Sequence, residues 1–320
     1  MSIKKGHRMS LSGLANQIVL MFGLMMVGFV INKLKFLHPV TTSDLTRILL
    51  TIIGPALIIT AFDTPFSVER VRLLLIGSVA MIVMYLVQII CAHLVFFKVE
   101  SPNLKRTAIY GSIYSNVGFL GIPLAGSLFG KTGVFFAVIA MAIFNVFNWS
   151  HGVSLFRTGG YGSPLVMIKE ILLNPNIIAI IIGLTLFLTS THLPSTIYQA
   201  FTYVGNANTP LSMIIVGNSL GDLKINRKMI NQPILIALVL RNLIFPVISI
   251  IILLFFHING VASSVLLLMS ACPVASLGVL FTLQVKGDVD PALTLMGTST
   301  LLSLVTIPLV FALYGVIQGL

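Results

Sequence analysis

Charge is the scarcest property of this 320-residue sequence. Only 8% of its residues are charged and 57% are hydrophobic, whereas roughly a quarter of a soluble domain is charged. The apolar runs are long, not short and alternating as in membrane β-barrels. The composition therefore excludes an ordinary soluble domain and predicts an all-α integral membrane protein that spans a lipid bilayer several times.

Motifs for enzymes, metals and nucleic acids are also missing. The two cysteines, Cys91 and Cys272, both lie in apolar segments, so they form neither a disulfide framework nor a metal motif. There is no His-Glu-x-x-His, no Gly-x-Ser-x-Gly and no Walker sequence, which argues against an enzyme, a metal site, a bound cofactor or ATP-driven transport. The formal net charge of +11 lies in loops, where it sets topology, and no soluble basic domain is present to bind nucleic acid.

Carboxylates are missing from the middle of the apolar runs. The eight acidic residues all fall at or near the ends of these runs. A buried carboxylate is the usual ligand for a transported cation or proton, so this absence disfavours sodium and leaves proton coupling or uniport. An anion, in contrast, is favoured by the unpaired N–H groups and the dipole at a helix N-terminus.

Windows of about twenty apolar residues predict ten transmembrane helices. The predicted spans are Leu11–Ile31, Leu45–Phe62, Val71–Phe96, Thr107–Leu128, Val134–Phe156, Ile177–Leu188, Ile197–Leu220, Pro233–Phe256, Val261–Val285 and Leu293–Ile317. A polar stretch divides them, which predicts a first five-helix repeat (1–156), a short cytoplasmic linker (157–170) and a second repeat (171–320). Because each half has an odd number of spans, the two halves insert in opposite senses.

Basic residues indicate the orientation. Of the 19 Lys and Arg residues, 12 lie in the odd-numbered loops and 6 on the other side. The positive-inside rule then puts both termini outside the cytoplasm, although Lys4, Lys5 and Arg8 in the N-terminal tail argue against this orientation.

Helix breakers occur at matching places in the two halves. The second and fourth spans carry Gly54-Pro55 and Gly121-Ile122-Pro123, and the seventh and ninth carry Thr209-Pro210 and Cys272-Pro273. Paired interruptions of this kind indicate a transporter's binding site, although single Gly and Pro residues are common in membrane helices. We expect breaks at these prolines.

Polar side chains within the spans are the candidates for binding a carboxylate. They are Asn116, Asn145, Asn148, Asn208, Ser212, Asn218, Ser270 and Cys272. Asn145 and Asn148 share one helix face, with His151 one turn further on and near the interface. The alternative for any one of them is a structural role, in which its side chain hydrogen-bonds to a neighbouring helix. Arg241 is predicted to snorkel to the headgroups; otherwise it neutralises a carboxylate, either the substrate's or that of Asp222 or Asp63.

Four segments resemble the auxin efflux carrier family, which includes plant auxin exporters and bacterial malate and malonate permeases. They are SNVGFLGIPLAGSLFG (115–130), NPNIIAIIIGL (174–184), GNANTPLSMIIVGNSLGDL (205–223) and ACPVASLGVLFTLQVKGDVDPALTLMGTSTLLSLVTIPL (271–309). The resemblance implies a 5+5 inverted repeat like that of bile-acid symporters, with broken helices 4 and 9 crossing. It also implies a scaffold, a transport domain that moves as an elevator, and a homodimer.

The resemblance also implies a binding site at the crossing. By position, Asn116, with Val117, Gly118 and Pro123, would face Pro273 and Val274 across it, and Asn145 would line the pocket. The long cytosolic loop of the plant exporters is missing here, which makes auxin an unlikely substrate. We therefore expect a secondary transporter of a small organic anion in the plasma membrane. The alternatives are an exporter of hydrophobic weak acids and a membrane receptor or structural protein that transports nothing.

Overall fold

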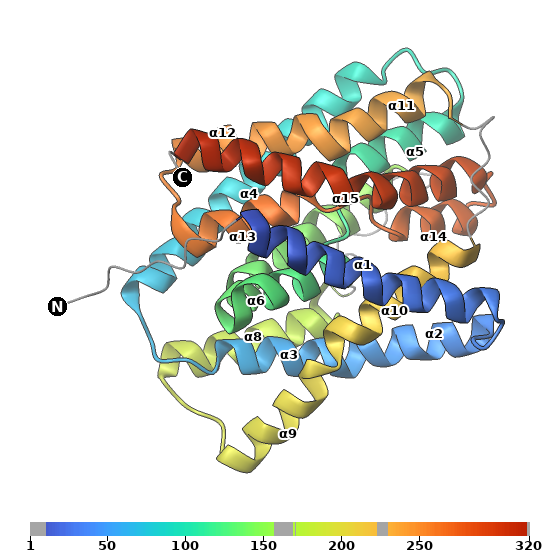
Figure 1. The fold of residues 1–320 in the computed structure, drawn as a ribbon. Helices are drawn as coiled ribbons and strands as arrows, with labels where there is room; N and C mark the ends of the chain where they lie inside the picture. Colours follow the sequence, from blue (N-terminus) through green and yellow to red (C-terminus); the bar gives the residue numbers. More distant parts are fainter. Residues whose placement is uncertain (1–10, 157–168, 170, 223–229, 319–320) are drawn as a thin grey trace.

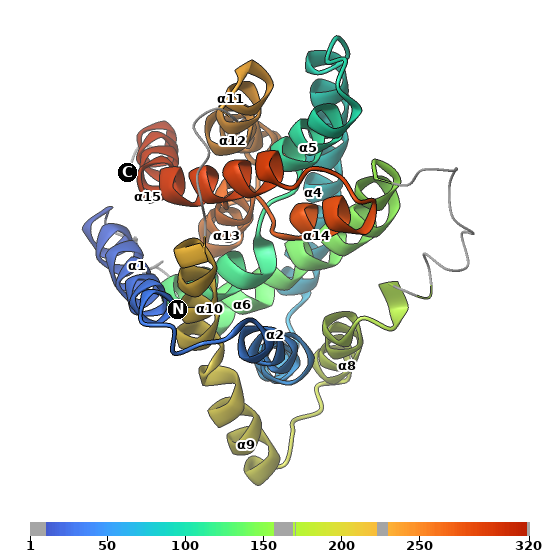
Figure 2. The same cartoon turned by 90° about the vertical axis from the view of Figure 1, so that its right-hand side faces the viewer.

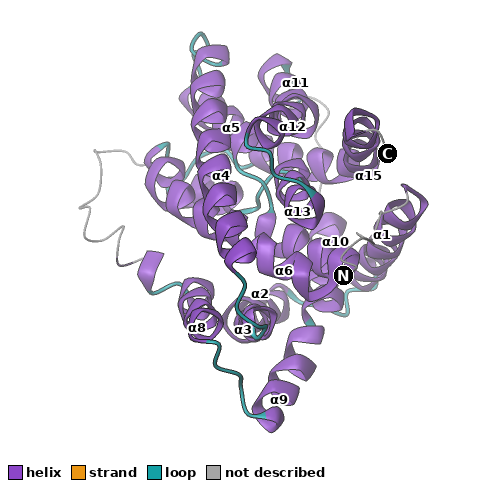
Figure 3. Cartoon of the chain, turned by 90° about the vertical axis from the view of Figure 1, so that its left-hand side faces the viewer, coloured by secondary structure: helices purple, strands orange, loops and turns teal. Residues whose placement is uncertain are grey.

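The described part of the chain folds into helices and the loops between them. We describe it from a computed structural model, which covers residues 11–156, 169, 171–222 and 230–318. No strand occurs in these ranges (Figure 3), and one isolated antiparallel β-bridge joins Ser115 to Val274. The predicted linker 157–170 lies outside the described residues, except for Lys169.

Helices cover the predicted apolar runs, and short π-helical turns (η) lie within several of them. The first half consists of α1 (Leu11–Lys33), α2 (Pro39–Ile48), η1 (Leu49–Ile53), α3 (Gly54–Phe62), α4 (Val68–Val95), α5 (Pro102–Ile113), η2 (Val117–Gly121), α6 (Ile122–Phe147) and η3 (Asn148–Gly152). The second half consists of α8 (Pro175–Thr189), α9 (Ser195–Asn206), α10 (Asn208–Asp222), α11 (Gln232–Val239), η5 (Leu240–Ile244), α12 (Phe245–Phe255), α13 (Gly260–Ala271), α14 (Leu277–Gln284) and α15 (Asp290–Gln318).

Length and composition suit a membrane. Among the described residues, six helical segments are long and apolar enough to cross one, and two shorter helices, α8 and α13, are also apolar. The longest segment, Val117–Gly152, has 36 residues and would be about 54 Å long as a straight helix, more than a bilayer core requires. Gly130, at φ 59° and ψ −149°, divides it, because glycine can adopt a positive φ without strain.

Three of the four predicted prolines, Pro55, Pro123 and Pro210, do not break the helix at their own positions. Pro55 follows η1 and Pro123 follows η2, in each case at the start of the next α-helix. A π turn skips one hydrogen bond, so it accommodates the missing N–H and the ring of the proline. The predicted break at Gly54-Pro55 is therefore wrong, since η1 and α3 run on with helical dihedral angles. The bend before Pro210 lies at Ala207, between α9 and α10.

The fourth and ninth predicted spans do break, one of them away from its proline. The fourth is non-helical at Tyr114–Asn116, seven residues before Pro123. The ninth is non-helical at Cys272, directly before Pro273, where α13 ends. The location predicted from Gly121-Ile122-Pro123 is thus corrected to Tyr114–Asn116.

The helices pack as two groups drawn from both halves of the chain (Figures 1 and 2). One group contains α1, α2, α3, α8, α9 and α10, and the other contains α4, α5, α6 and α11 to α15. Contacts between the groups run mainly from α3, α1 and α10 to α6, and from α1 to α15. We call them the α1–α10 group and the crossing group.

Glycines bring α1 and α10 into close backbone contact. A Cβ at Gly28 would overlap the Ile214 carbonyl, and one at Gly217 would overlap the Met25 carbonyl. Small residues of this kind allow membrane helices to approach closely. At the end of the interface, Asn32 Nδ2 donates to Asp222 at 2.7 Å.

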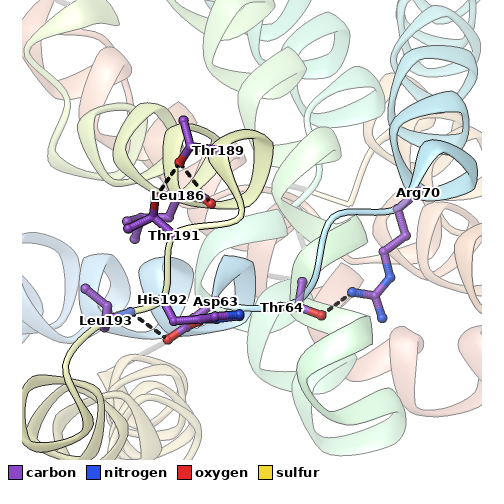
Figure 4. Close-up of polar contacts among 8 residues, drawn as sticks. All are labelled: Asp63, Thr64, Arg70, Leu186, Thr189, Thr191, His192 and Leu193. Atoms are coloured by element: carbon purple, nitrogen blue, oxygen red, sulfur yellow. Dashed lines mark hydrogen bonds and ion pairs between the residues drawn. The ribbon is translucent and has the colours of Figure 1, made fainter.

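The loop from α3 to α4 connects the two groups (Figure 4). The Asp63 carboxylate accepts from the Leu193 N–H at 3.3 Å and lies 2.5 Å from His192 Nδ1, while Arg70 donates to the Thr64 hydroxyl. The Asp63 contacts hold the end of α3 against the loop that follows α8. The Arg70 contact holds the start of α4 against the loop that precedes it.

Candidate functional site at the helix crossing

The two broken helices meet through their backbones. The Asn116 N–H donates to the Pro273 carbonyl at 2.7 Å, and the Ala275 N–H donates to the Tyr114 carbonyl at 2.9 Å. Together these bonds form the antiparallel bridge between Ser115 and Val274. In hydrocarbon an unpaired backbone group costs several kcal/mol, so each unwound segment supplies the partners that the other lacks.

Asn116 sits where the second half of one broken helix begins. Its side-chain oxygen accepts from the Phe119 N–H at 3.2 Å and so caps η2. Its Nδ2 donates to no described residue, and the side chain is only half-buried. A Cβ at Gly118 would meet nothing within 4 Å, while Val117 is buried. The amide N–H₂ is therefore available as a donor for an acceptor such as a carboxylate.

The matching helix start on the other side of the crossing lacks a side-chain cap. Helix α14 follows Ser276, whose hydroxyl makes no capping hydrogen bond, and both Ser276 and Leu277 are half-buried. Helix starts carry N–H groups without intrahelical partners and a partial positive charge. The crossing thus presents two helix N-termini, of which one is capped by an amide.

Arg241 is buried beside the crossing, so its guanidinium does not reach solvent or headgroups. It is only 1% exposed. Its Nη1 donates to the carbonyls of Ser112 and Ile113 at 3.4 and 2.6 Å, and its Nη2 donates to the Ser270 carbonyl. The prediction that Arg241 snorkels is therefore wrong. Its pairing with Asp63 or Asp222 is wrong too, because Asp63 contacts the His192–Leu193 loop and Asp222 accepts from Asn32. Arg241 binds instead the C-terminal carbonyls of α5 and α13.

Sequence reasoning missed Asn242, Ser249 and Ser299, which complete this polar layer together with the predicted Ser270. Ser299 of α15 accepts from the Val274 N–H at 3.1 Å and exchanges hydrogen bonds with Asn242 of η5 at 3.1 and 3.2 Å. The Ser249 and Ser270 hydroxyls lie 2.6 Å apart. The available signal was the Arg241-Asn242 pair within an apolar run.

The two predicted asparagines of the fifth span have separate partners. Asn145 Nδ2 donates to the Met141 carbonyl of its own helix at 2.9 Å. Asn148, fully buried in η3, accepts from the Tyr110 hydroxyl at 2.7 Å. His151 Nδ1 lies 2.9 Å from the Tyr114 hydroxyl. The η3 turn thus contacts two tyrosines, Tyr110 and Tyr114, of the helix that ends at the crossing. The buried Asn148 Nδ2 and His151 Nε2 have no hydrogen-bond partner among the described residues.

The remaining predicted site residues lie around the crossing or away from it. Pro123, Cys272, Pro273 and Val274 are buried at or beside it, and a Cβ on Gly121 would press on Met269 and Cys272. Ser212 is buried on α10 and donates to the Thr209 carbonyl at 3.0 Å, whereas Pro210 is exposed. The structure thus brings Asn116 together with Pro273 and Val274, and leaves Pro55, Pro210 and Ser212 in the α1–α10 group.

Two small cavities lie near the crossing, each with room for about one water molecule. One is lined only by apolar side chains between the two helix groups, among them Met21, Met25, Leu120 and Met213. The other lies beside Val274, Ala275, Tyr110 and the first turn of α14.

Comparison with known proteins points to transport. The family model described as membrane transport protein matches residues 14–311. The chain is 27% identical to an uncharacterized transporter of Methanothermobacter thermautotrophicus, over 89% of this chain and 93% of the relative. It is 25% identical to an uncharacterized transporter of Methanocaldococcus jannaschii, over 93% of this chain and 96% of the relative. The chain therefore belongs to the membrane transport protein family, the auxin efflux carrier family that its motifs resemble, and is a multi-pass membrane protein.

Proposed function

We propose that this protein is a secondary transporter of a small organic anion, whose carboxylate binds at the helix crossing. The observation that carries the proposal is the Ser115–Val274 bridge, because it places the free Nδ2 of Asn116 at a helix N-terminus. An amide donor and helix N-termini favour a carboxylate without requiring a buried positive side chain. A receptor or structural protein that transports nothing would have no need for two unwound helices at one point.

The proposed transport cycle moves the crossing group past the α1–α10 group. In this scheme ten spans form two inverted repeats of five, 1–156 and 171–320, joined by the linker 157–170. The α1–α10 group is the scaffold and the crossing group is the elevator. Glycine packing of α1 on α10 supports this division, because it makes the scaffold rigid. The contacts from the scaffold to α6 are the surface over which the elevator slides. We further propose a plasma-membrane location, both termini outside the cytoplasm, and assembly as a homodimer.

An anion with an apolar body is the second candidate substrate. The small cavity between the two groups is lined only by apolar side chains and includes Leu120 of η2, four residues after Asn116. If the two groups separate there during transport, a substrate bound through its carboxylate would meet an apolar wall, which suits an aromatic acid better than malate or malonate. This observation favours a hydrophobic weak acid, which is the runner-up function.

A thermal-shift screen of the purified protein in detergent tests the proposal. The ligands are malate, malonate, succinate and phenylacetate, each paired with its uncharged methyl ester as a matched control. A ligand that binds the native state raises the unfolding midpoint with its concentration. We expect at least one acid to do so and its ester not to. Stabilisation by phenylacetate alone selects the hydrophobic weak acid, and equal effects of acids and esters would refute carboxylate binding.

A further inference from the structure

Arg241 is a buried charge without a carboxylate partner among the described residues. It is 1% exposed, and the partners of its two terminal nitrogens are backbone carbonyls, while its Nε has none in the described chain. An uncompensated buried cation is costly, so its position requires a physical reason.

The reason lies in the helix ends that it joins. The carbonyls of Ser112 and Ile113 belong to the last turn of α5, and the carbonyl of Ser270 to the last turn of α13. The C-terminus of a helix carries about half a negative charge, so two such ends together offset about one guanidinium. Arg241 is therefore neutralised by the two half-helices that stop at the crossing.

Backbone carbonyls converging from two helix ends are also the ligands that broken helices offer to a sodium ion. Here the guanidinium already occupies that position and forms bonds to both helix ends. The start of its side chain is held in place, because η5 keeps Arg241 beside Asn242, which is hydrogen-bonded to Ser299. The carbonyls of Ser112, Ile113 and Ser270 already accept from the guanidinium, whose positive charge would also repel a free cation there.

We propose that Arg241 is a tethered cation that takes the place of a free metal ion at the crossing. It is a positioning residue that holds the ends of α5 and α13 together. The helix ends left for a solute are then the two N-termini, at Val117 and Leu277, both of which favour an anion. Only this last consequence rests on the proposed function; the tethered cation itself does not depend on the substrate.

Three substitutions separate charge from volume. Arg241→Lys keeps the charge, Arg241→Met fills much of the space without it, and Arg241→Ala opens a cavity. Arg70→Ala is the matched control, because Arg70 also donates to a neighbouring oxygen, that of Thr64, but lies in the first turn of α4, away from the crossing. The unfolding midpoint of each purified protein is measured in choline, sodium, potassium and guanidinium chloride at equal low millimolar concentration, far below denaturing levels.

We expect Arg241→Lys to keep most of the midpoint and Arg241→Met to lose much more of it. Guanidinium is expected to raise the midpoint of Arg241→Ala, by refilling the vacated position, but not that of Arg70→Ala or the unaltered protein. The unaltered protein should unfold at one temperature in choline, sodium and potassium. Equal losses in Arg241→Lys and Arg241→Met, or no response of Arg241→Ala to any cation, would contradict the proposal.

The salt comparison on the unaltered protein covers the case in which the variants fail to fold. Folding of Arg241→Lys alone supports the proposal, because it shows that charge is required. If none folds, equal midpoints of the unaltered protein in the three salts support it, and stabilisation specific to sodium overturns it. These outcomes are independent of any carboxylate, so they are distinguishable from failure of the proposed function.

Discussion

Two interfaces of this molecule are built by opposite means. Between α1 and α10, Gly28 and Gly217 let the backbones touch. At the crossing, Arg241, Ser299 and the Ser115–Val274 bridge connect backbones through hydrogen bonds. Close backbone contact leaves little room for rearrangement, whereas hydrogen-bonding groups can exchange partners with a solute. On this difference we propose rigidity for the first interface and binding for the second.

The largest loss is expected from filling the glycine interface. In Gly217→Val the new side chain would overlap the Met25 carbonyl, so α1 and α10 must separate. We expect a loss of about 3 kcal/mol or more, seen as loss of the monodisperse peak in size-exclusion chromatography. Gly23→Ala on α1 is the control, since a Cβ there meets nothing within 4 Å and its effect should stay within about 1 kcal/mol. A normal peak for Gly217→Val would remove the contrast between the interfaces.

The second effect concerns the polar layer of the crossing. Ser299→Ala leaves the buried Val274 N–H without its acceptor, which costs about 1–3 kcal/mol. Ser303→Ala removes an equally buried hydroxyl that bonds only its own helix, to the Thr300 carbonyl, so it should cost about 1 kcal/mol or less. Thermal unfolding of the two variants compares them directly. Equal midpoints would show that the Val274 N–H does not depend on Ser299.

The third prediction separates capping from binding. Asn116→Ala and Ser101→Ala each remove the side-chain cap of a helix, η2 and α5 respectively, and each should cost about 1 kcal/mol. Only Asn116→Ala should abolish counterflow of the stabilising acid in proteoliposomes, because only Asn116 offers its amide at the crossing. Unchanged counterflow in Asn116→Ala would remove this residue from the site.

The smallest change is expected outside both interfaces, in the loop contacts of Figure 4. His192→Ala removes the neighbour of Asp63, but the His192 side chain is 57% exposed, so water can replace it and salt screens the pair. The Leu193 N–H still donates to Asp63. We expect a shift in the unfolding midpoint smaller than that of Ser299→Ala. A larger shift would mean that this loop, and not the crossing, limits stability.

The sequence predicted the helices but not how the two interruptions are held together. Run length alone placed helices over the apolar segments, because the bilayer core fixes how many residues are needed. Pro55 and Pro123 suggested breaks, yet π turns absorb both. The true break at Tyr114–Asn116 contains neither Gly nor Pro, since it is held open by Pro273 and Ala275 more than 150 residues away.

Arg241 was misplaced for a similar reason. Its position near the end of an apolar run suggested access to the headgroups, whereas its partners are carbonyls of two other helices. A backbone carbonyl has no sequence signature, so a charge that binds only backbone leaves no complementary acid to find. Asn116, in contrast, was proposed as a site residue because an amide beside a helix break is chemically unusual in a membrane, and it does lie at the crossing.

The Ser115–Val274 bridge also constrains how the protein is made. The chain leaves the ribosome from its N-terminus, so Tyr114–Asn116 is synthesised long before Pro273 and Ala275, which supply its partners. Until then the Asn116 N–H and the Tyr114 carbonyl lack these partners, and hydrocarbon would impose a cost of several kcal/mol on each. We therefore expect the segment between α5 and η2 to reach its final place in the bilayer only after α13 and α14 have been made, so that the early half of the chain is completed last.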